Sequence, residues 1–368
     1  MRLHIFNPEH DIALAANQKR FTAPHAGRQM RADLGFLPAL WAEDGDMVLV
    51  DDVEAALEAL RHLRRYAADV VFVTLSDLRN IIYSLEDNLV VSPWGWDITL
   101  KEQLERAVDD SSRLSLPDDN ILAAIRQMSS RQFAAEQLLP KLSAMEGATI
   151  GESRWCSSLD EVLIELSRLG GGVVKSPWSS SGRGVRYIRC STPDAHLLGW
   201  ISNVVRQQGG VMVEPFYQKV CDFGVEFNAG TGGRIEYCGL SLFGTRGGAY
   251  TGSLCATESD KRDILSRYVN LDLLDSVCSR IIEILQPLMH GVYEGPFGVD
   301  MMAVVGLDDG FMLHPCVELN LRRTMGHVAL ALSPSELEPR RMMSVYYSDK
   351  YRIRVQTLTD NLLNTGLV

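Results

Sequence analysis

The sequence predicts a mixed fold, in which an N-terminal α/β domain with a parallel sheet precedes an α+β core of two lobes. In residues 1–115, short apolar runs alternate with helical patterns, which is typical of a parallel sheet covered by helices. Further along the chain, two Gly-containing turns each join a pair of strand-like runs, which indicates antiparallel hairpins. We therefore expect one domain over 1–115, a first lobe over 116–215 and a second lobe over 216–368.

The composition narrows the class of protein. A chain of 368 residues can form two or three domains. Its net charge of −11 and the lack of a long basic run argue against a nucleic-acid-binding surface. The seven cysteines include no CxxC pair, so we expect reduced thiols and a cytoplasmic location. No signal peptide and no apolar stretch of ~20 residues is found, so no membrane partner is expected. The sequence leaves open whether the chain forms a homo-oligomer.

Four strands of the N-terminal domain are predicted from short apolar runs. They lie at 3–6, 47–50, 70–74 and 89–91, with helices over 53–66 and 76–85. Polar clusters follow the first and the last of these strands, where ligands of parallel sheets gather. The candidate substrate-binding residues there are Asn7, Glu9, His10, Asp11, Trp94 and Trp96. A helix capped by Asn7 or Asp11, and a packed aromatic turn, are the alternatives.

Helices are predicted between and after the strands of the core. Two follow a break at 116–120, over 121–128 and 132–139, and Pro140 is expected to end the second. Further helical patterns cover 159–169, 201–207 and 260–286. We expect the final stretch, 336–368, to be mostly helical with an interruption at 346–351.

A hairpin with acidic residues is predicted near the end of the core. Its strands are 298–305 and 311–320, joined by a turn at 306–310. Because side chains alternate along a strand, Glu318 and Asn320 share a face. Folding about the turn should bring Asp300 near Cys316, one step from Glu318.

The oxygen atoms of this hairpin predict a metal site. Asp300, Glu318 and Asn320 would place two carboxylates and an amide oxygen together. Like charges so close repel unless a cation lies between them. Mg²⁺ is often held by one or two carboxylates plus phosphates, and Mn²⁺ is the alternative metal. A solvated acidic strand face is the other interpretation.

A Ser/Gly-rich loop predicts an anion site. Lys175 lies in an apolar strand, the loop covers 178–184, and another strand follows at 186–188. The loop is not a Walker A loop, which would open a helix. Its small residues let backbone N–H groups approach an anion, and Lys175 could place a charge on a phosphate. A mobile surface hairpin with a snorkelling lysine is the alternative.

A further apolar strand, 211–214, ends in Glu214 and Pro215. Proline cannot donate to a strand ladder, so this segment indicates a hinge between two lobes. Backbone groups exposed there could bind the edge of an adenine base.

In this order, the motifs resemble the ATP-grasp superfamily. The resemblance covers roughly 117–333, and 1–115 resembles the Rossmann-like domain that often precedes such a core. It implies that Lys175 contacts the α- and β-phosphates of ATP, that the loop closes over the β- and γ-phosphates, and that 213–216 holds adenine. The implied nucleotide-binding residues are Arg131, Lys175, Ser179, Ser180, Ser181, Gly182, Arg183, Gly184, Val213, Glu214 and Phe216. Arg131 stands where the family usually has a second lysine. The implied metal ligands are Asp300, Glu318 and Asn320.

The implied reaction is carboxylate activation on a small molecule or peptide. A substrate carboxylate would attack the γ-phosphate to give an acylphosphate, and an amine or thiol would then displace phosphate. Such chemistry needs positioning and cations rather than a protein nucleophile. A kinase that phosphorylates a hydroxyl and a non-catalytic nucleotide-binding module are the alternatives.

Three arginines and a histidine complete the predicted site. Arg322 keeps the alternation of 318 and 320 and is expected to steady the transferring phosphoryl group, with Arg323 instead if the strand ends early. Arg246 lies in a second Gly-rich segment, 241–252, and is expected to face an acidic group. His327 could orient the substrate. A surface arginine and a disordered loop are the alternatives.

Overall fold

The computed structural model describes residues 1–358 apart from 180–181, 190–192, 247–248 and 307–309. The chain divides into two compact units. Unit 1 comprises Met1–Arg126, Gly252–Thr257 and Arg322–Leu362, and unit 2 comprises Gln127–Thr251 and Glu258–Leu321, with Leu363–Val368 outside the described residues. The three-part division expected from the sequence stays a prediction.

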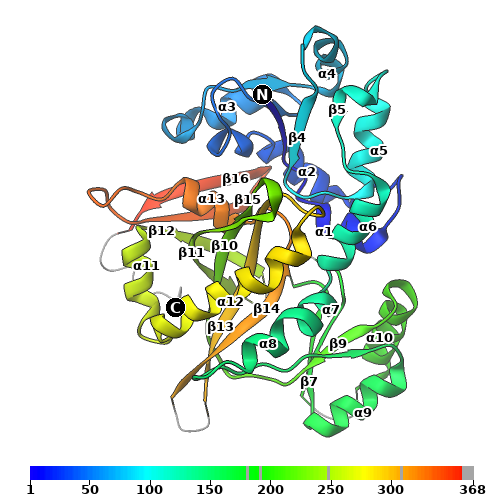
Figure 1. The fold of residues 1–368 in the computed structure, drawn as a ribbon, viewed down its shortest axis with the longest axis vertical. Coiled ribbons are helices and arrows are strands. Elements are labelled where there is room, and N and C mark those ends of the chain that lie inside the picture. Colours follow the sequence, from blue (N-terminus) through cyan, green and yellow to red (C-terminus); the bar gives the residue numbers. More distant parts are fainter. Residues whose placement is uncertain (180–181, 190–192, 247–248, 307–309, 359–368) are drawn as a thin grey trace. The chain divides into compact units, whose positions relative to one another are not determined.

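Unit 1 contains the predicted parallel sheet, drawn in blue and cyan in Figure 1. The strand order is β3-β2-β1-β4-β5, and each neighbouring pair is parallel. The strands are β1 (Arg2–Ile5), β2 (Met47–Leu49), β3 (Val71–Val73), β4 (Leu89–Pro93) and β5 (Leu114–Ser115). The first four confirm the predicted runs, and β5 is a short addition.

Helices connect these strands and cover the sheet. They are α1 (His10–Ala16), α2 (His25–Leu34), α3 (Val53–Leu60), α4 (Leu75–Ile81), α5 (Ile98–Ala107) and α6 (Asp119–Met128), with short 3₁₀ turns η1 (Leu37–Leu40), η2 (Arg61–Tyr66), η3 (Ile82–Ser84) and η4 (Ser111–Arg113). The helix start at α4 is fixed by a capping box in which Thr74 and Asp77 bond each other's backbone N–H groups. Leu78 of α4 and Leu104 of α5 pack on Ile5 in one apolar core.

The end of unit 1 is an antiparallel hairpin rather than the predicted helices. β15 (Arg341–Tyr347) pairs with β16 (Tyr351–Thr357), and β12 (Ala249–Cys255) pairs with β15 through Ser253 and Met343. The expected helical stretch over 336–368 is therefore wrong as far as residue 358. Met343 and Ile353 are buried while their chain neighbours are more exposed, so the segment follows the two-residue period of a strand. One short helix, α13 (Met325–Ala331), precedes it.

Unit 2 contains two antiparallel arrangements of strands. The first is a four-stranded sheet of order β6-β9-β7-β8, formed by β6 (Arg154–Cys156), β7 (Gly172–Lys175), β8 (Val185–Ile188) and β9 (Val211–Glu214). Helices α9 (Leu159–Leu169) and α10 (Ala195–Gln208) pack on the face that carries Val174 and Val213. Val173 lies opposite Glu214, so Lys175 and Glu214 share the other face.

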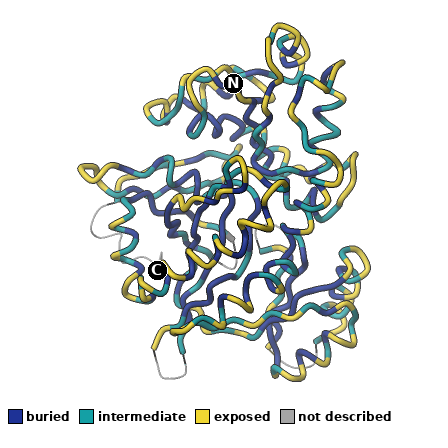
Figure 2. The backbone as a smooth tube through the Cα atoms, in the orientation of Figure 1, coloured by how far each residue is buried: buried dark blue, intermediate teal, exposed yellow. Residues whose placement is uncertain are grey.

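The second arrangement in unit 2 follows the order β14-β13-β10-β11. Its strands are β10 (Lys219–Ala229), β11 (Ile235–Arg246), β13 (Gly295–Val305) and β14 (Phe311–Asn320). The tube in Figure 2 is mostly dark blue along these strands, because Phe223, Phe297 and Leu319 are buried. The predicted hairpin of 298–305 and 311–320 is confirmed, and 307–309 lie outside the described residues.

Three sequence expectations in unit 2 need correction. Pro140 does not end a helix: it lies in the first turn of α8 (Leu139–Ser143), where proline is tolerated, after α7 (Arg131–Phe133) and the π-helix η5 (Ala134–Leu138). The pattern over 260–286 is two helices, α11 (Glu258–Leu265) and α12 (Leu271–Met289), because Asn270 caps the second. Most of 241–252 is strand, in β11 and β12, rather than loop.

Among the helices of the described residues, none is long and apolar enough to cross a bilayer. The cysteines that the structure describes are not joined in disulfides: Cys156, Cys221, Cys238, Cys255, Cys278 and Cys316.

Candidate active site

Acidic side chains of β13 and β14 come together in unit 2. Asp300 lies directly opposite Glu318, and Gly298 lies opposite Asn320. The Nδ2 atom of Asn320 donates a hydrogen bond of 3.1 Å to Oδ2 of Asp300. The three residues that the sequence marked as metal ligands therefore occupy neighbouring positions on two paired strands.

The register of this hairpin differs from the predicted one. Asp300 pairs with Glu318 rather than Cys316, because the register shifts between Asp300 and Met302. This shift places the two carboxylates opposite each other. Cys316 is buried, and burial raises the pKa of its thiol, with a further contribution from Asp300. It therefore stays protonated and neutral at neutral pH.

A third carboxylate, Glu226 on β10, was missed in the sequence. Gly224 of β10 lies opposite Asp300, and Glu226 lies opposite Gly298. A Cβ atom at Gly224 would be 3.2 Å from Oε1 of Glu226 and 3.5 Å from Oδ1 of Asp300. The signal was present, because Phe223 and Val225 are apolar on one face while Gly224 and the buried Glu226 point to the other.

Arg131 joins the acidic hairpin to the Ser/Gly-rich loop. Its Nη2 lies 2.8 Å from Oε1 of Glu318. Its Nη1 donates to the carbonyl oxygen of Ser176 at 2.7 Å and to Oγ of Ser179 at 2.8 Å. Only 7% of this side chain is exposed. Ser130 caps α7 through the N–H of Phe133 and so fixes the start of the helix that carries Arg131.

Lys175 is a buried cation paired with Glu214. Its Nζ lies 2.5 Å from Oε2 of Glu214, and the two side chains are 10% and 8% exposed. Ser153 donates a hydrogen bond of 3.0 Å to the other oxygen of Glu214. The lysine does not extend into solvent, which rules out the snorkelling alternative. A buried charge of this kind requires the partner that it has.

The base of the Ser/Gly-rich loop is closed by Gly184. Its carbonyl oxygen accepts hydrogen bonds from the N–H of Ser176 at 2.8 Å and from its Oγ at 3.1 Å. A Cβ at position 184 would lie 2.1 Å from that Oγ and 2.4 Å from Cβ of Ser179. Only glycine fits there. Gly182 has a positive φ and Arg183 is exposed, while Ser180 and Ser181 lie outside the described residues.

The predicted adenine segment has two differently oriented parts. The Val213 side chain packs in the core with residues of α9 and α10, and its backbone lies in the ladder between β6 and β7. Phe216 is 59% exposed and contacts the ring of Tyr187, with 6.1 Å between centroids. Tyr217 packs on the ring of His314 at 5.4 Å. Burial lowers the pKa of His314 to about 4, so this ring is neutral.

Two of the predicted arginines, Arg322 and Arg323, have partners within unit 1. In unit 1, Nε and Nη2 of Arg322 donate to the two oxygens of the Asp11 carboxylate, each at 2.8 Å. The guanidinium of Arg323 lies 4.4 Å from the ring centroid of Trp41, and its N–H donates to the carbonyl oxygen of Trp94. Arg246 is the last residue of β11 in unit 2, and its side chain lies outside the described part of the structure.

His327 of unit 1 takes part in a helix cap. The ring Nδ1 accepts from the N–H of Thr324 at 3.2 Å, and Thr324 in turn accepts from the N–H of His327. This capping box begins α13. The sequence gave no sign of it, because the usual N3 residue of a capping box is Glu or Gln.

The N-terminal polar cluster forms a network within unit 1. Asn7 donates to the carbonyl oxygen of Gly95 at 2.8 Å and to Asp97 at 3.3 Å. His10 Nδ1 also contacts Asp97 at 3.3 Å, and its ring packs so tightly on Gly95 that a Cβ there would lie 2.6 Å away. The aromatic residues are structural neighbours of this network: Trp94 packs on Phe6, and Trp96 packs on the core of the sheet.

No group of three or more His, Cys, Asp or Glu side chains in the described residues is arranged to hold a metal ion. The Asp300, Glu318 and Asn320 set combines two carboxylates with an amide. That donor set suits Mg²⁺, which takes oxygen ligands and completes its shell with water and phosphate oxygens.

Comparison with known proteins gives a structural likeness only. No family model matches the chain, and no curated protein matches it. N5-carboxyaminoimidazole synthetase from Staphylococcus aureus, complexed with ADP, aligns with 94% of this chain and 82% of its own, at 12% identity and a TM-score of 0.49. The structural neighbours are ATP-grasp proteins.

Two more neighbours have similar values. Carboxyaminoimidazole ribonucleotide synthase from Aspergillus clavatus, complexed with ATP, has 14% identity and a TM-score of 0.48 over 94% of this chain and 81% of that one. A putative ATP-grasp superfamily protein from Archaeoglobus fulgidus has 13% identity and a TM-score of 0.46 over 98% and 100%. Because these TM-scores are below 0.5, the functional argument rests on the residues of the site.

Proposed function

We propose that this protein is an ATP- and Mg²⁺-dependent ligase of the ATP-grasp type, which joins a carboxylate to an amine, or to a thiol, through an acylphosphate. One observation carries the proposal: a buried arginine links the acidic pair on β13 and β14 to the Ser/Gly-rich loop. Arg131 contacts Glu318 on one side and Ser176 and Ser179 on the other. Cations, carboxylates and an anion-binding loop therefore meet within unit 2.

The cations of this site would bind the phosphates of ATP. Lys175 and Arg131 are now neutralised by Glu214 and Glu318. The ion pairs hold both cations in place before the nucleotide arrives, which reduces the ordering needed on binding. Ser179 and the N–H groups of the loop would add donors to the phosphates. Glu214 and the segment up to Phe216 would contact adenine.

The acidic residues would hold the metal. Asp300, Glu318 and Asn320 supply oxygen atoms, and Glu226 adds a buried carboxylate beside Asp300. When bound, Mg²⁺ would offset negative charge on the phosphates. Arg131 would keep Glu318 oriented, since its fork fixes the direction of a carboxylate.

The reaction that we propose needs no protein nucleophile. An oxygen of the substrate carboxylate forms a bond to the γ-phosphorus, and the bond from that phosphorus to the β,γ-bridging oxygen breaks to release ADP. The amine then attacks the acyl carbon, loses a proton and releases phosphate. The protein would contribute positioning and positive charge through Lys175 and Arg131, and Arg322 or Arg246 would be further candidates for the phosphoryl group.

The proposal is tested by measuring ADP release with a panel of amino acids and short peptides, together with mass spectrometry of the products. We expect ADP and phosphate to form with a new amide or thioester. Asp300→Ala and Glu318→Ala should lower the rate at least about 100-fold, because each removes a metal ligand. Glu283→Ala, an exposed residue of α12, is the matched control and should leave the rate unchanged.

Other outcomes would identify the alternatives. A stable phosphorylated product without an amide would show a kinase. ATP binding without turnover on any acceptor would favour a non-catalytic module. Full activity in both the Asp300 and Glu318 variants would contradict the metal assignment.

The role of Glu226 is tested separately by a Mg²⁺ titration of the same activity. Glu226→Gln keeps the shape of the side chain but removes its charge beside Asp300. We expect the Mg²⁺ concentration for half-maximal rate to rise by about tenfold, since fewer negative charges attract the cation. Glu236→Gln on the adjacent β11, which is 59% exposed, is the control. Equal Mg²⁺ dependence in both variants would remove Glu226 from the site.

A further inference from the structure

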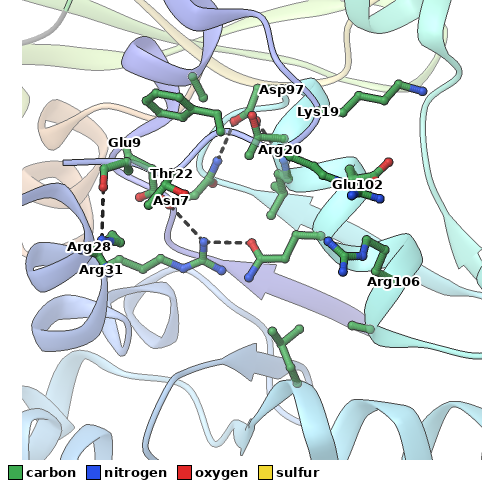
Figure 3. A pocket seen from close by; sticks show the side chains of 18 of the residues that line it. Asn7, Glu9, Lys19, Arg20, Thr22, Arg28, Arg31, Asp97, Glu102 and Arg106 are labelled. Atoms are coloured by element: carbon green, nitrogen blue, oxygen red, sulfur yellow. Dashed lines mark hydrogen bonds and ion pairs between the residues drawn. The ribbon is translucent and has the colours of Figure 1, made fainter. Parts of the chain in front are cut away.

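A large cavity lies in unit 1 at the carboxyl ends of the parallel strands (Figure 3). Its volume is about 1040 Å³. The wall includes residues that follow four strands: Asn7 after β1, Asp51 after β2, Leu75 after β3 and Asp97 after β4. The cavity is therefore formed by the sheet itself rather than by one loop.

The strand order places this cavity at a change of direction in the sheet. The chain runs outward from β1 to β2 and β3, and it then returns to the other side of β1 with β4 and β5. Asn7 and Asp97, which follow β1 and β4, meet at that change of direction. Open parallel sheets bind ligands at this position, because the connections diverge there and leave a crevice.

The lining of the cavity is rich in positive charge. It contains the cations Lys19, Arg20, Arg28, Arg31, Arg79 and Arg106, and the acids Glu9, Asp51, Asp97 and Glu102. This excess of cations occurs in a chain whose net charge is −11. A concave surface of one sign raises the local concentration of ligands of the opposite sign, so the cavity favours anions.

Most of the acids in the wall already have partners. Asp97 caps α5 and bonds Asn7, and Glu9 holds Arg31 at 3.0 Å. Glu102 lies 3.6 Å from Arg20. These carboxylates orient the wall and neutralise part of its charge.

Three arginines of the cavity wall are not held in a strong ion pair. Within the described residues, Arg28 and Arg106 have no carboxylate partner within 4.0 Å. The partner of Arg79 is Asp109, at 3.8 Å and 66% exposed, a pair that contributes little. The guanidinium groups of these three residues can therefore bind a ligand without breaking a strong ion pair.

Hydrogen bonds to backbone carbonyl oxygens hold the side chains of Arg79 and Arg28 in place. Arg79 Nε donates to the carbonyl oxygen of Ala107, next to Arg106 at the end of α5. Arg28 Nε donates to the carbonyl oxygen of Ala23 at 3.1 Å. Figure 3 shows the Arg31 side chain extending from α2 toward α5, where it donates a hydrogen bond of 3.2 Å to Gln103. This contact connects the α2 and α5 sides of the cavity.

We propose that this cavity binds a small organic polyanion, whose charged groups are held by Arg28, Arg79 and Arg106. Planar guanidinium forks match both phosphate and carboxylate oxygens. Several arginines around one space favour a ligand with at least two negative charges, and the volume suits an organic molecule rather than a lone ion. The site goes beyond the nucleotide site proposed above, since all residues that line it belong to unit 1.

The test is calorimetric titration of the full chain with glycerol 3-phosphate, with citrate and with inorganic phosphate. We expect glycerol 3-phosphate or citrate to bind more tightly than inorganic phosphate, and the better one identifies the charged group as phosphate or carboxylate. Arg79→Gln combined with Arg106→Gln should weaken that binding at least about tenfold. The matched control removes two equally charged, exposed arginines elsewhere, Arg61→Gln with Arg234→Gln, and should change it less than about twofold.

Two more variants keep the test decisive. Arg28→Gln alone should weaken the same binding by several-fold, independently of how the double variant folds. Lys175→Ala, in the phosphate-binding part of unit 2, should leave it unchanged, which separates this cavity from the proposed ATP site. The proposal is overturned if none of the three anions binds, if the double variant and its control behave alike, or if Lys175→Ala abolishes binding. None of these results would alter the outcome of the ADP-release experiment.

Discussion

The side chain of Arg131 contacts three different groups at once. It neutralises Glu318, bonds the backbone at Ser176 and orients Ser179. Arg131 reaches Glu318 with Nη2 and the two serines with Nη1, whereas the donors of a lysine all lie on one nitrogen and cannot reproduce this spread. Arg131 is therefore a structural connection as well as a candidate phosphate ligand.

Replacing Arg131 tests this double role. We expect Arg131→Gln to lower the free energy of unfolding by about 2 kcal/mol, because it leaves a partly buried carboxylate and a carbonyl oxygen without their donor. Arg131→Lys should recover part of that stability but still weaken ATP binding. Urea unfolding and ATP titration measure the two effects. Wild-type stability and ATP affinity in both variants would contradict the assignment.

His314 is a buried histidine whose protonation should oppose folding. Burial lowers its pKa from the ordinary 6.5 to about 4. As pH falls below 6.5, the unfolded chain binds a proton at this position and the folded chain does not, so stability decreases until pH reaches about 4. Over that window the loss is about 3 kcal/mol.

The measurement is the free energy of unfolding in urea from pH 7 to pH 4. We expect His314→Leu to reduce the pH-dependent loss by about 3 kcal/mol, whatever its stability at pH 7. The informative quantity is the change of unfolding free energy with pH, because the other groups titrate equally in both proteins. Parallel pH profiles for the two proteins would show that the ring is protonated in the native state.

At the scale of elements, the turns and the alternation of side chains along the strands could be predicted from the sequence, and the strand register could not. The hairpin of β13 and β14 follows from period-two alternation around a Gly-containing turn. Its bulge between Asp300 and Met302 has no local signal: it lies in the pairing of β13 with β14, while β13 pairs with β10 in regular register at the same residues. Over 341–357, strands were taken for helices although β15 and β16 form a hairpin that is local in the sequence; only the pairing of β15 with β12 is distant.

The Ser/Gly-rich loop gives a prediction at this scale. Gly184→Ala would place a methyl group 2.1 Å from Oγ of Ser176, so the base of the loop must move. We expect a loss of about 1–3 kcal/mol in unfolding free energy and weaker ATP binding. Gly199→Ala, in the open middle of α10, is the control and should stabilise the chain by about 0.5–1 kcal/mol. Unchanged ATP affinity in the Gly184 variant would separate the loop from the nucleotide.

At the scale of the molecule, the fold class was predictable and the composition of the compact units was not. The alternation of strand and helix patterns in 1–115 predicted the parallel sheet of unit 1. That unit also includes Gly252–Thr257 and Arg322–Leu362, which local patterns could not assign to it. For the site, Asp300, Glu318 and Lys175 were found from local motifs. Glu226 was missed although strand alternation separates it from the apolar Phe223 and Val225, and the pairing of β10 with β13 shows that it lies beside Asp300.

The N-terminal part of unit 1 should consequently not fold when the chain is cut after Arg126, where the first segment of this unit ends. Within unit 1, the N–H of Tyr351 donates to Asp33 at 2.8 Å, His62 bonds the carbonyl oxygen of Ile353 at 3.2 Å, and Arg341 binds the hydroxyl of Tyr66 at 2.6 Å. A fragment of residues 1–126 lacks all these partners.

We expect such a fragment to lack a cooperative thermal transition by circular dichroism, since a small domain has little stability in reserve. A fragment that joins 1–126 to 322–358 through a flexible linker restores those bonds and should melt cooperatively. If 1–126 alone melts cooperatively and binds the same anions as the full chain, the N-terminal part is an independent domain and the contacts with β15 and β16 are dispensable.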